Sequence, residues 1–452
     1  MKSLLGHLAV LSFIVLLAAC GGGGSGSYGD SGSSSSGGSG SGGSSSGNGS
    51  SSGGSSSGGG NINFSVWVSN GNNNSVTEIT PAAISAGSCS TSTCIVFTGG
   101  GMNGAGPLTV DVHGDVWVAN EPVGASSGSA PYSVTEITAE AVAAGACSSA
   151  SCLNYTGGGI FAIKDITADV NGNIWVADSC APTTNFAAAP CGHGNGGITE
   201  IKPGAAQDCS SGCIYFLIPQ NSNNDGVPQL FPQGVTTDGQ GNVWFTNNGC
   251  VVSNCPVNTG SLVEIPLSSV QAGSCSGCVL YSNGNIADPR EVAVDMVGNA
   301  WVANSCGPAN CFDYSGGSVT EIEKGASPDC SSGCVDYTGG DVSQPETVAV
   351  DNSGNIWVSD PALPGLTEIT SAAATAGTCS VSSCVNFNTG GITVDTRAMA
   401  IDPNGDIWLT RSTDGTVLEV ASGAPVDCSS GCIRISLPQS VQLNAEDVAI
   451  MP

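Results

Sequence analysis

Basic residues are scarce in this sequence. Lysine and arginine together number 8 of 452 residues, against 36 aspartates and glutamates, so the formal net charge is −28. A surface that binds nucleic acid or an anionic membrane neutralises several phosphates with clustered basic side chains. Too few basic residues are present to build such a patch, which makes both poor partners. The hydrophobic content of 40% still allows a packed core, so the chain is not an acidic disordered one.

Histidine is scarcer still, with 3 residues, whereas cysteine is abundant, with 21. A structural zinc site needs four converging ligands, yet apart from Cys20 the cysteines occur as close pairs that lie far from one another along the chain. Close pairs in an exported chain instead predict disulfides, each worth roughly 2 kcal/mol because it closes a short loop. The predicted pairs are Cys89/Cys94, Cys147/Cys152, Cys180/Cys191, Cys209/Cys213, Cys250/Cys255, Cys275/Cys278, Cys306/Cys311, Cys330/Cys334, Cys379/Cys384 and Cys428/Cys432.

Residues 1–20 begin with a lysine, continue as an apolar run and end in Leu-Ala-Ala-Cys. This pattern is typical of a secretory signal and is too short for a spanning helix. The last four residues resemble the bacterial lipobox, which implies that Cys20 is acylated; an ordinary cleaved signal is the alternative. Because Gly21 rather than aspartate follows, the resemblance implies an outer-membrane lipoprotein, on the periplasmic or the cell-surface side.

Residues 21–60 are almost wholly glycine and serine. Such a tract forms no core and behaves as a flexible coil, with an end-to-end distance of roughly 35 Å for forty residues. We expect it to be a tether that lifts the following domain off the membrane.

From residue 61 to residue 452 the chain repeats a unit of about 56 residues. Every unit has a tryptophan run, a Thr-Glu-Ile-like run, a cysteine pair and a final short run. Six of the seven units also open with a β-branched run ending in Asp and a D-x-x-G-[ND] turn, whereas the first unit has Phe64 in place of the turn glycine. Four short strands joined by turns, without helical periodicity, predict a propeller blade. The first unit lacks the opening run, and the last residues, EDVAIMP, supply a matching one. We therefore expect an all-β, seven-bladed β-propeller of four-stranded blades, closed by its C-terminal strand.

The D-x-x-G-[ND]-x-W turn resembles that of NHL-type propellers, and most of all the streptogramin (virginiamycin B) lyase branch. The resemblance covers residues 61–452 and implies the same fold. For activity it implies a Mg²⁺-assisted base on the face where the loops lie, with an essential histidine. This sequence departs from that pattern, because His113 lies in a turn on the opposite face and His193 lies between Cys180 and Cys191. Asp360 stands at the place of the family's strand-end glutamate.

Three repeated residue types have competing interpretations. The motif Asp of VDNSGNIWVSD, Asp351, fits a calcium loop poorly, because an EF-hand needs Gly at position six and Glu at position twelve. A tight turn accounts for both repeated positions of the motif. In such a turn Asp351 accepts hydrogen bonds from backbone N–H groups two or three residues on, and Gly354 has positive φ. The seven tryptophans are a sugar-stacking platform or, more simply, wedges between blades. The glutamate of each Thr-Glu-Ile run is a general acid or a structural group; identical carboxylates on every blade cannot converge on one substrate.

The candidate site is the face that carries the long loops 178–197, 247–261 and 304–317, on three adjacent blades. Polar residues are expected to border it in two rings, one three residues after each tryptophan and one at the start of each innermost strand. Charges in the second ring either pair with one another at the axis or hold a polar ligand or divalent cation. The predicted ligand-binding residues are Asn120, Asp178, His193, Asn247, Asn304, Asp360, Lys164, Arg290, Glu346 and Arg397. Asp178 and Asp360 are the predicted ligands for a Ca²⁺ or Mg²⁺ ion.

These observations favour a membrane-anchored, surface or periplasmic binding or scaffold module that recognises an unidentified protein or glycan with this face. The alternative is a divalent-metal-dependent lyase or hydrolase resembling streptogramin lyase. A mechanical spacer without a ligand is a third possibility. The departures at the histidines favour a protein without catalytic activity.

Overall fold

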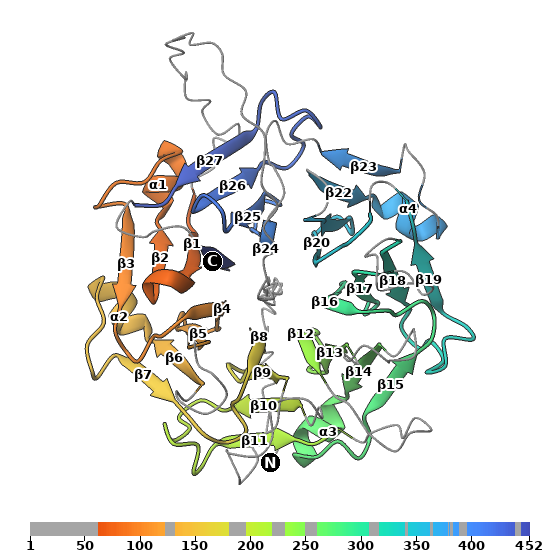
Figure 1. The fold of residues 1–452 in the computed structure, drawn as a ribbon, viewed down its shortest axis with the longest axis horizontal. Helices are drawn as coiled ribbons and strands as arrows, with labels where there is room; N and C mark the ends of the chain where they lie inside the picture. The colour runs from red at the N-terminus through yellow and green to blue at the C-terminus, as the bar shows by residue number, and fades with distance from the viewer. Residues whose placement is uncertain are drawn as a thin grey trace, which may run out of the picture.

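The computed structural model describes residues 62–122, 132–179, 196–218, 231–248, 260–306, 316–339, 342–361, 365–377, 379, 383–387, 396–438 and 444–452. Seven four-stranded antiparallel sheets are arranged around a central axis as the blades of a propeller (Figure 1). The predicted all-β, seven-bladed fold is confirmed. The expected signal peptide (1–20), Cys20 and the tether (21–60) lie outside the described residues. Among the helices that are described, none has the length and apolarity needed to cross a membrane.

The four strands of each blade run in order from the axis to the rim, and blades are numbered one to seven from the first strand of the chain. The innermost strands are β28 (Ala445–Met451), β4 (Ala105–Val110), β8 (Ile163–Ala168), β12 (Pro232–Thr237), β16 (Pro289–Val294), β20 (Thr347–Val350) and β24 (Thr396–Ile401). The second strands are β1 (Ser65–Asn70), β5 (Val116–Asn120), β9 (Ile174–Asp178), β13 (Val243–Asn247), β17 (Ala300–Asn304), β21 (Ile356–Ser359) and β25 (Ile407–Arg411). The third strands are β2 (Ser75–Ile79), β6 (Ser133–Ile137), β10 (Gly197–Ile201), β14 (Ser261–Ile265), β18 (Ser318–Ile322), β22 (Leu366–Ile369) and β26 (Thr416–Val420). The outer strands are β3 (Cys94–Thr98), β7 (Cys152–Tyr155), β11 (Cys213–Phe216), β15 (Val279–Ser282), β19 (Cys334–Tyr337), β23 (Cys384–Phe387) and β27 (Cys432–Ser436).

The ring closes as the sequence predicts. Strand β28 pairs antiparallel with β1, from Ser65 opposite Met451 to Asn70 opposite Ala445. Blade one therefore takes its innermost strand from the C-terminus and its other three from the N-terminal end of the propeller (Figure 1). This arrangement leaves β1 with no open edge.

The tryptophans are core residues. All seven are at most 6% exposed, and every residue of the second strands is buried, because each blade is covered on both faces by its neighbours. Six of the seven pack against a Phe or Tyr of the outer strand of their own blade, with ring centroids 5.2 to 5.8 Å apart. The interpretation of the tryptophans as wedges between blades agrees with this burial.

The motif Asp organises the turn before each tryptophan. Oδ1 of Asp351 accepts from the backbone N–H groups of Ser353 and Asn355, at 2.8 and 2.9 Å, and Gly354 has φ +77°. The partners thus lie two and four residues on, rather than two or three. Oδ2 accepts from Nε1 of Trp357 at 3.0 Å, a bond the sequence analysis did not anticipate. Six blades share this tryptophan–aspartate bond, at 3.0 to 3.2 Å.

Blade one lacks this bond. Met451 stands where the other innermost strands are followed by Asp, and the fully buried Nε1 of Trp67 has no hydrogen-bond partner. Trp175 is matched to Trp67, since both are fully buried and both pack against a Phe, but Nε1 of Trp175 donates to Asp169. We expect Trp175→Phe to lower the free energy of unfolding by about 1 kcal/mol more than Trp67→Phe does, because it leaves Asp169 without one donor. Denaturant unfolding of the two variants measures the difference, and equal losses would contradict it.

The connection between the third and outer strands differs from the expected plain turn in four blades. Short helices occur there: α1 (Pro81–Ala86), α2 (Ala139–Ala144), α3 (Leu267–Ala272) and α4 (Ser371–Ala376). Each follows a Thr or Pro and ends at a glycine, and six residues are too few to show a helical period. A 3₁₀ turn, η1 (Gly71–Asn73), joins β1 to β2.

Seven disulfides fasten these connections, one in each blade. The bonded pairs are Cys89–Cys94, Cys147–Cys152, Cys209–Cys213, Cys275–Cys278, Cys330–Cys334, Cys379–Cys384 and Cys428–Cys432. The predicted disulfides are thus confirmed for these seven pairs. Cys306 is also disulfide-bonded, whereas Cys180, Cys191, Cys250, Cys255 and Cys311 lie outside the described residues. Disulfides of this number indicate an oxidising, extracytoplasmic compartment.

Candidate functional site

The ring has two different faces. The loop face is the side where second strands end and innermost strands begin. On this side, backbone hydrogen bonds join the end of a second strand to the start of the innermost strand of the same blade. Examples are Ser179 N–H to Ala162 O at 3.1 Å and Ser305 N–H to Asp288 O at 3.2 Å. The turn face is the opposite side, which carries the D-x-x-G turns and the disulfide connections. The predicted division of the connections between two faces follows from this topology.

Side chains of the D-x-x-G turns hold the connections of the turn face. The side chain of the last turn residue accepts from the backbone N–H of the second residue after the third strand. Examples are Asp115 with Ala139 at 2.6 Å and Asn355 with Ser371 at 2.9 Å, where the acceptor meets the start of α2 or α4. The same contact recurs in blades four, five and seven. The Asn or Asp of the motif is therefore a structural cap on the turn face.

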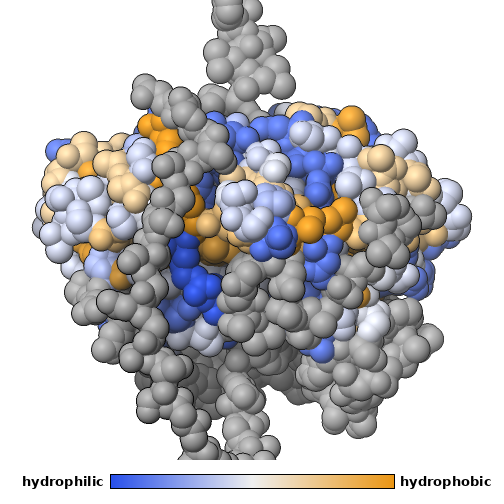
Figure 2. Space-filling model, turned by 90° about the horizontal axis from the view of Figure 1, so that it is seen from above, coloured by the Kyte–Doolittle hydropathy of each residue, from blue (hydrophilic) through white to orange (hydrophobic). Residues whose placement is uncertain are grey.

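Exposed apolar side chains also concentrate on the turn face. Among the described residues, six of the seven exposed large hydrophobic side chains lie there, and Leu217 at the loop-face end of β11 is the exception. The six are Val112, Val170, Leu267, Met296, Val297 and Val426. Seen from its edge, the ring shows polar and apolar atoms interspersed over the part that is coloured (Figure 2).

The strand-end amides Asn120, Asn247 and Asn304 bridge three strands in the same way. Each side-chain oxygen accepts from a backbone N–H of the segment before the innermost strand, at 2.7 to 3.3 Å. Each NH₂ group donates to a Ser or Thr hydroxyl of the third strand, at 2.8 to 3.4 Å. All three are at most 5% exposed. They therefore fix the frame of the loop face, and contact with a ligand stays a prediction.

The two strand-end aspartates are buried in the same frame. Asp178 accepts from Phe161 N–H at 2.9 Å and from the Thr199 hydroxyl at 2.7 Å, and its burial raises its pKa well above the usual range. Oδ2 of Asp360 accepts from two successive backbone N–H groups, starting with Ser343 at 2.6 Å. Each oxygen of Asp178 already accepts one hydrogen bond from the protein, and the side chain is fully buried, so a metal ion there would have to reach a carboxylate that is closed off from solvent. Their role as Ca²⁺ or Mg²⁺ ligands stays a prediction.

The second predicted ring contains the most connected group of the loop face. Arg290 donates to Asp288 Oδ2 at 2.8 Å and to Ser305 Oγ at 3.1 Å. Ser305 Oγ donates to Asp288 Oδ2 at 2.5 Å, and the Asn248 amide donates to Asp288 Oδ1. We call these four residues the Arg290 network. Asn248 and Ser305 are the residues immediately after β13 and β17, so the network ties together the roots of the long loops of blades four and five.

Lys164, Gln233, Glu346 and Arg397 occupy the equivalent place near the start of other innermost strands. Gln233 is 8% exposed and the other three are partly exposed. Glu346 and Arg397 make polar interactions of their own. The structure thus places the predicted polar ring at the entry to the axis, while His193 lies outside the described residues.

Buried carboxyls beside this ring are functional candidates that the sequence analysis missed. Oδ2 of Asp165 accepts from Val235 N–H of the next blade, and Oδ2 of Asp447 accepts from Leu108 N–H of the next blade, both at 2.7 Å. Both are 1% exposed, as is Glu291 at the same strand position. Burial raises the pKa of Asp165 and Asp447, and the charge of Asp165 raises that of Asp447 further. The sequence signal that could have found them is an acidic residue of the innermost strand directly after the polar ring position, followed by an apolar residue.

The glutamates of the third strands lie opposite the tryptophans and have raised pKa values, because they are buried. Glu136, Glu264 and Glu321 accept from a Tyr hydroxyl of the outer strand, at 2.6 to 3.1 Å. In blades three and seven the outer strand has no Tyr at that position, and burial raises the pKa of Glu200 and Glu419 to about 7. Because each glutamate packs within its own blade, a structural interpretation fits better than a shared catalytic role.

Comparisons with known proteins support the fold. No family model and no curated protein matches the chain. A solved streptogramin B lyase structure is 12% identical, covering 74% of this chain and 83% of that chain, with a TM-score of 0.47. A protein from Lactobacillus plantarum is 10% identical, covering 86% and 98%, with a TM-score of 0.50. The Pseudomonas aeruginosa periplasmic gluconolactonase PpgL is 12% identical, covering 86% and 99%, with a TM-score of 0.49. At these identities the likeness concerns the propeller fold alone.

Proposed function

We propose that this protein is a membrane-anchored, extracytoplasmic β-propeller that binds another protein through its loop face. The observation that carries the proposal is the Arg290 network. It joins an arginine and an aspartate, 16% and 14% exposed, to the roots of two long loops on adjacent blades. A charged group held by several hydrogen bonds at the base of loops is preorganised for recognition, because little order has to be gained on binding.

The chemistry of the described surface favours a protein over a glycan. Sugar recognition commonly uses exposed aromatic rings, and every tryptophan of the chain is buried. The net charge of −28 attracts a partner with a basic surface, through complementary potentials that raise the rate of encounter. Lipid attachment at Cys20 and the tether of residues 21–60 would hold the propeller at the membrane while leaving the loop face accessible.

Site-specific photo-crosslinking in the producing cell tests the loop face. A photoreactive amino acid at Leu217, 70% exposed at the loop-face end of β11, is expected to give a discrete adduct with a protein. The same amino acid at Val297, 67% exposed on the turn face, is the matched control and is expected to give none. Arg290→Ala should abolish the Leu217 adduct, whereas Arg434→Ala, the same charge change on the exposed outer strand β27, should preserve it. Equal adducts from both faces, or an adduct insensitive to Arg290→Ala, would contradict the proposal.

The alternative function is a divalent-metal-dependent lyase or hydrolase. If the protein has this function, we expect Mg²⁺ or Ca²⁺ to raise its melting temperature, and we expect Asp178→Ala or Asp360→Ala to abolish that rise. The binding function expects no such shift from either ion at the loop face. A shift lost in Asp360→Ala would therefore favour the enzyme.

A further inference from the structure

One D-x-x-G turn differs from the other five in its polar side chains. The turn of blade two reads Asp-Val-His-Gly-Asp, with His113 in third place and a second carboxylate, Asp115, in fifth. In the other turns the third residues are Asn171, Gln240, Val297, Ser353 and Asn404, and the fifth residues are Asn173, Asn242, Asn299, Asn355 and Asp406. Blade two is the one turn that combines an imidazole with two carboxylates.

In blade two the fifth residue is Asp instead of Asn. An Asp side chain has no N–H group to donate to Oδ2 of the motif Asp. In three turns the Asn side chain donates to Oδ2 of the motif Asp, at 2.7 to 2.9 Å. In blade two, Asp111 accepts from two backbone N–H groups at Oδ1 and from Trp117 Nε1 at Oδ2. A carboxylate offers about four acceptor positions, so about one position on Oδ2 stays open. Nδ1 of His113 lies 3.6 Å from that oxygen.

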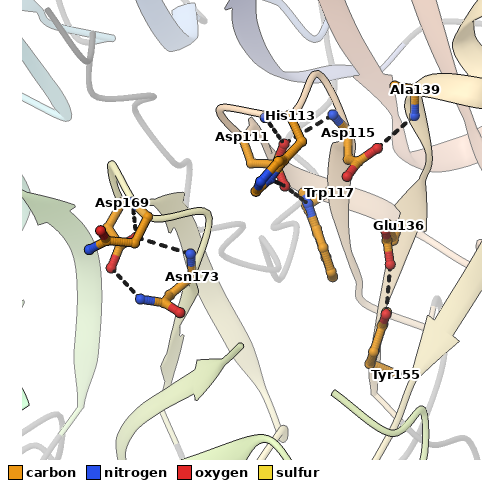
Figure 3. A network of polar contacts seen from close by, with 10 residues as sticks. Asp111, His113, Asp115, Trp117, Glu136, Ala139, Tyr155, Asp169 and Asn173 are labelled. Atoms are coloured by element: carbon orange, nitrogen blue, oxygen red, sulfur yellow. Dashed lines mark hydrogen bonds and ion pairs between the residues drawn. The ribbon is translucent and has the colours of Figure 1, made fainter. Parts of the chain in front are cut away.

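The three side chains are close enough to share one ion. One ligand atom from each of Asp111, His113 and Asp115 lies within 4.8 Å of the other two. Metal–ligand distances of roughly 2.1 Å to Nδ1 and Oδ2, applied to their 3.6 Å separation, give an angle of roughly 120° at the metal, close to a tetrahedral value. Figure 3 shows these residues gathered on one turn, with Asp115 also held by Ala139 at the start of α2.

The neighbouring blade helps to hold the imidazole. A Cβ added at Gly172, in the turn of blade three, would lie 2.6 Å from Cε1 of His113. The ring therefore packs directly on that glycine, which has φ +78°. The side chain of His113 is nevertheless 56% exposed, so an ion from solvent can reach it.

We propose that Asp111, His113 and Asp115 form a binding site for a divalent transition-metal ion of the zinc class, completed by water. Imidazole nitrogen with carboxylate oxygen suits zinc and its neighbours, whereas Ca²⁺ and Mg²⁺ prefer oxygen ligands alone. An ion also relieves the repulsion between the two adjacent carboxylates of Asp111 and Asp115. The site is on the turn face and is independent of the proposed partner binding on the loop face.

Zinc titration of the full-length protein, purified without a histidine tag, tests this site. Calorimetry is expected to show saturable binding of one Zn²⁺ that His113→Ala or Asp115→Asn weakens by at least about tenfold. His193→Ala is the matched control, because His193 is the other histidine after the expected signal peptide, and it should leave binding unchanged. With Cu²⁺ as probe, electron paramagnetic resonance should show coupling to one imidazole nitrogen that His113→Ala removes.

A gain-of-site variant makes the test independent of loss by misfolding. The turn of blade seven already has carboxylates at Asp402 and Asp406, with Asn404 between them. Asn404→His gives blade seven the same three ligand side chains and is expected to add a second saturable Zn²⁺ site, weaker than the first because blade one has no D-x-x-G turn to pack against the imidazole. Absence of saturable binding to the unmodified protein, or binding that His113→Ala leaves intact, would overturn the site.

Discussion

Deleting residues 444–452 is expected to prevent the propeller from folding. The deletion removes β28, which is the innermost strand of blade one and the closure of the ring. Ala445 and Val448 of this strand are fully buried, and Asp447 bonds to Leu108 of blade two and to Ser69 of β1. Without the strand, β1 presents an open edge and the core on both sides of blade one is exposed to water. We expect insoluble protein or loss of a cooperative thermal transition.

Two controls separate ring closure from a general effect of truncation. Removal of Pro452 alone, which is exposed and lies beyond β28, should leave the melting temperature unchanged. Asp447→Ala should keep the fold but lower the free energy of unfolding by about 2–4 kcal/mol, because the buried N–H of Leu108 loses its acceptor. A soluble, cooperatively melting protein lacking 444–452 would show that the ring does not need its closing strand.

Stability is expected to fall as the pH rises from 5 to 8. Burial raises the pKa of Glu200 and Glu419 from the ordinary 4.5 to about 7, and it raises the pKa of Asp165, Asp178 and Asp447 in the same direction. Between pH 4.5 and 7 the folded protein therefore binds more protons than the unfolded chain. The stability that these groups contribute is fully present below their unfolded pKa and is lost as the pH rises through their folded pKa.

Glu419→Gln isolates one of these groups. Glu419 is 3% exposed, and the charges of Asp406 and Asp402 add to the effect of burial on its pKa. The variant should be nearly neutral at pH 5 and should raise the free energy of unfolding at pH 8, on the order of 2 kcal/mol. Glu140→Gln, on the exposed first turn of α2, is the control. Denaturant unfolding at both pH values measures the slope, and a wild-type protein more stable at pH 8 would contradict the account.

The fold could be predicted because each repeat contains the residues that set its turn and strands within a short stretch of sequence. Asp351, Gly354 and Trp357 lie within seven residues, so turn, strand and wedge are set by neighbours in the chain. The disulfides could likewise be predicted, because each joins two cysteines that are close in the sequence. The four short helices were missed for the same reason, because a six-residue segment is too short to show a period and is fixed by a cap and a glycine.

The candidate site was only partly predictable, because its contacts join different blades. The sequence placed Arg290 in a polar ring, but its bonds to Asp288 and Ser305, and the bond from Asn248 to Asp288, depend on the position of two loop roots. The burial of Asp165 and Asp447 depends on how innermost strands of neighbouring blades meet at the axis.

The sequence by itself determined the number of blades, the closing strand, the local disulfides and the scarcity of basic surface. Those features follow from composition and from contacts between residues near one another in the chain, or from a repeat with one missing piece. Only the tertiary structure decided which carboxyls are buried, that Gly172 of the neighbouring blade packs against the His113 ring, and how the roots of the long loops are joined. These are properties of neighbouring blades, whose approach is set by the packing of the whole ring.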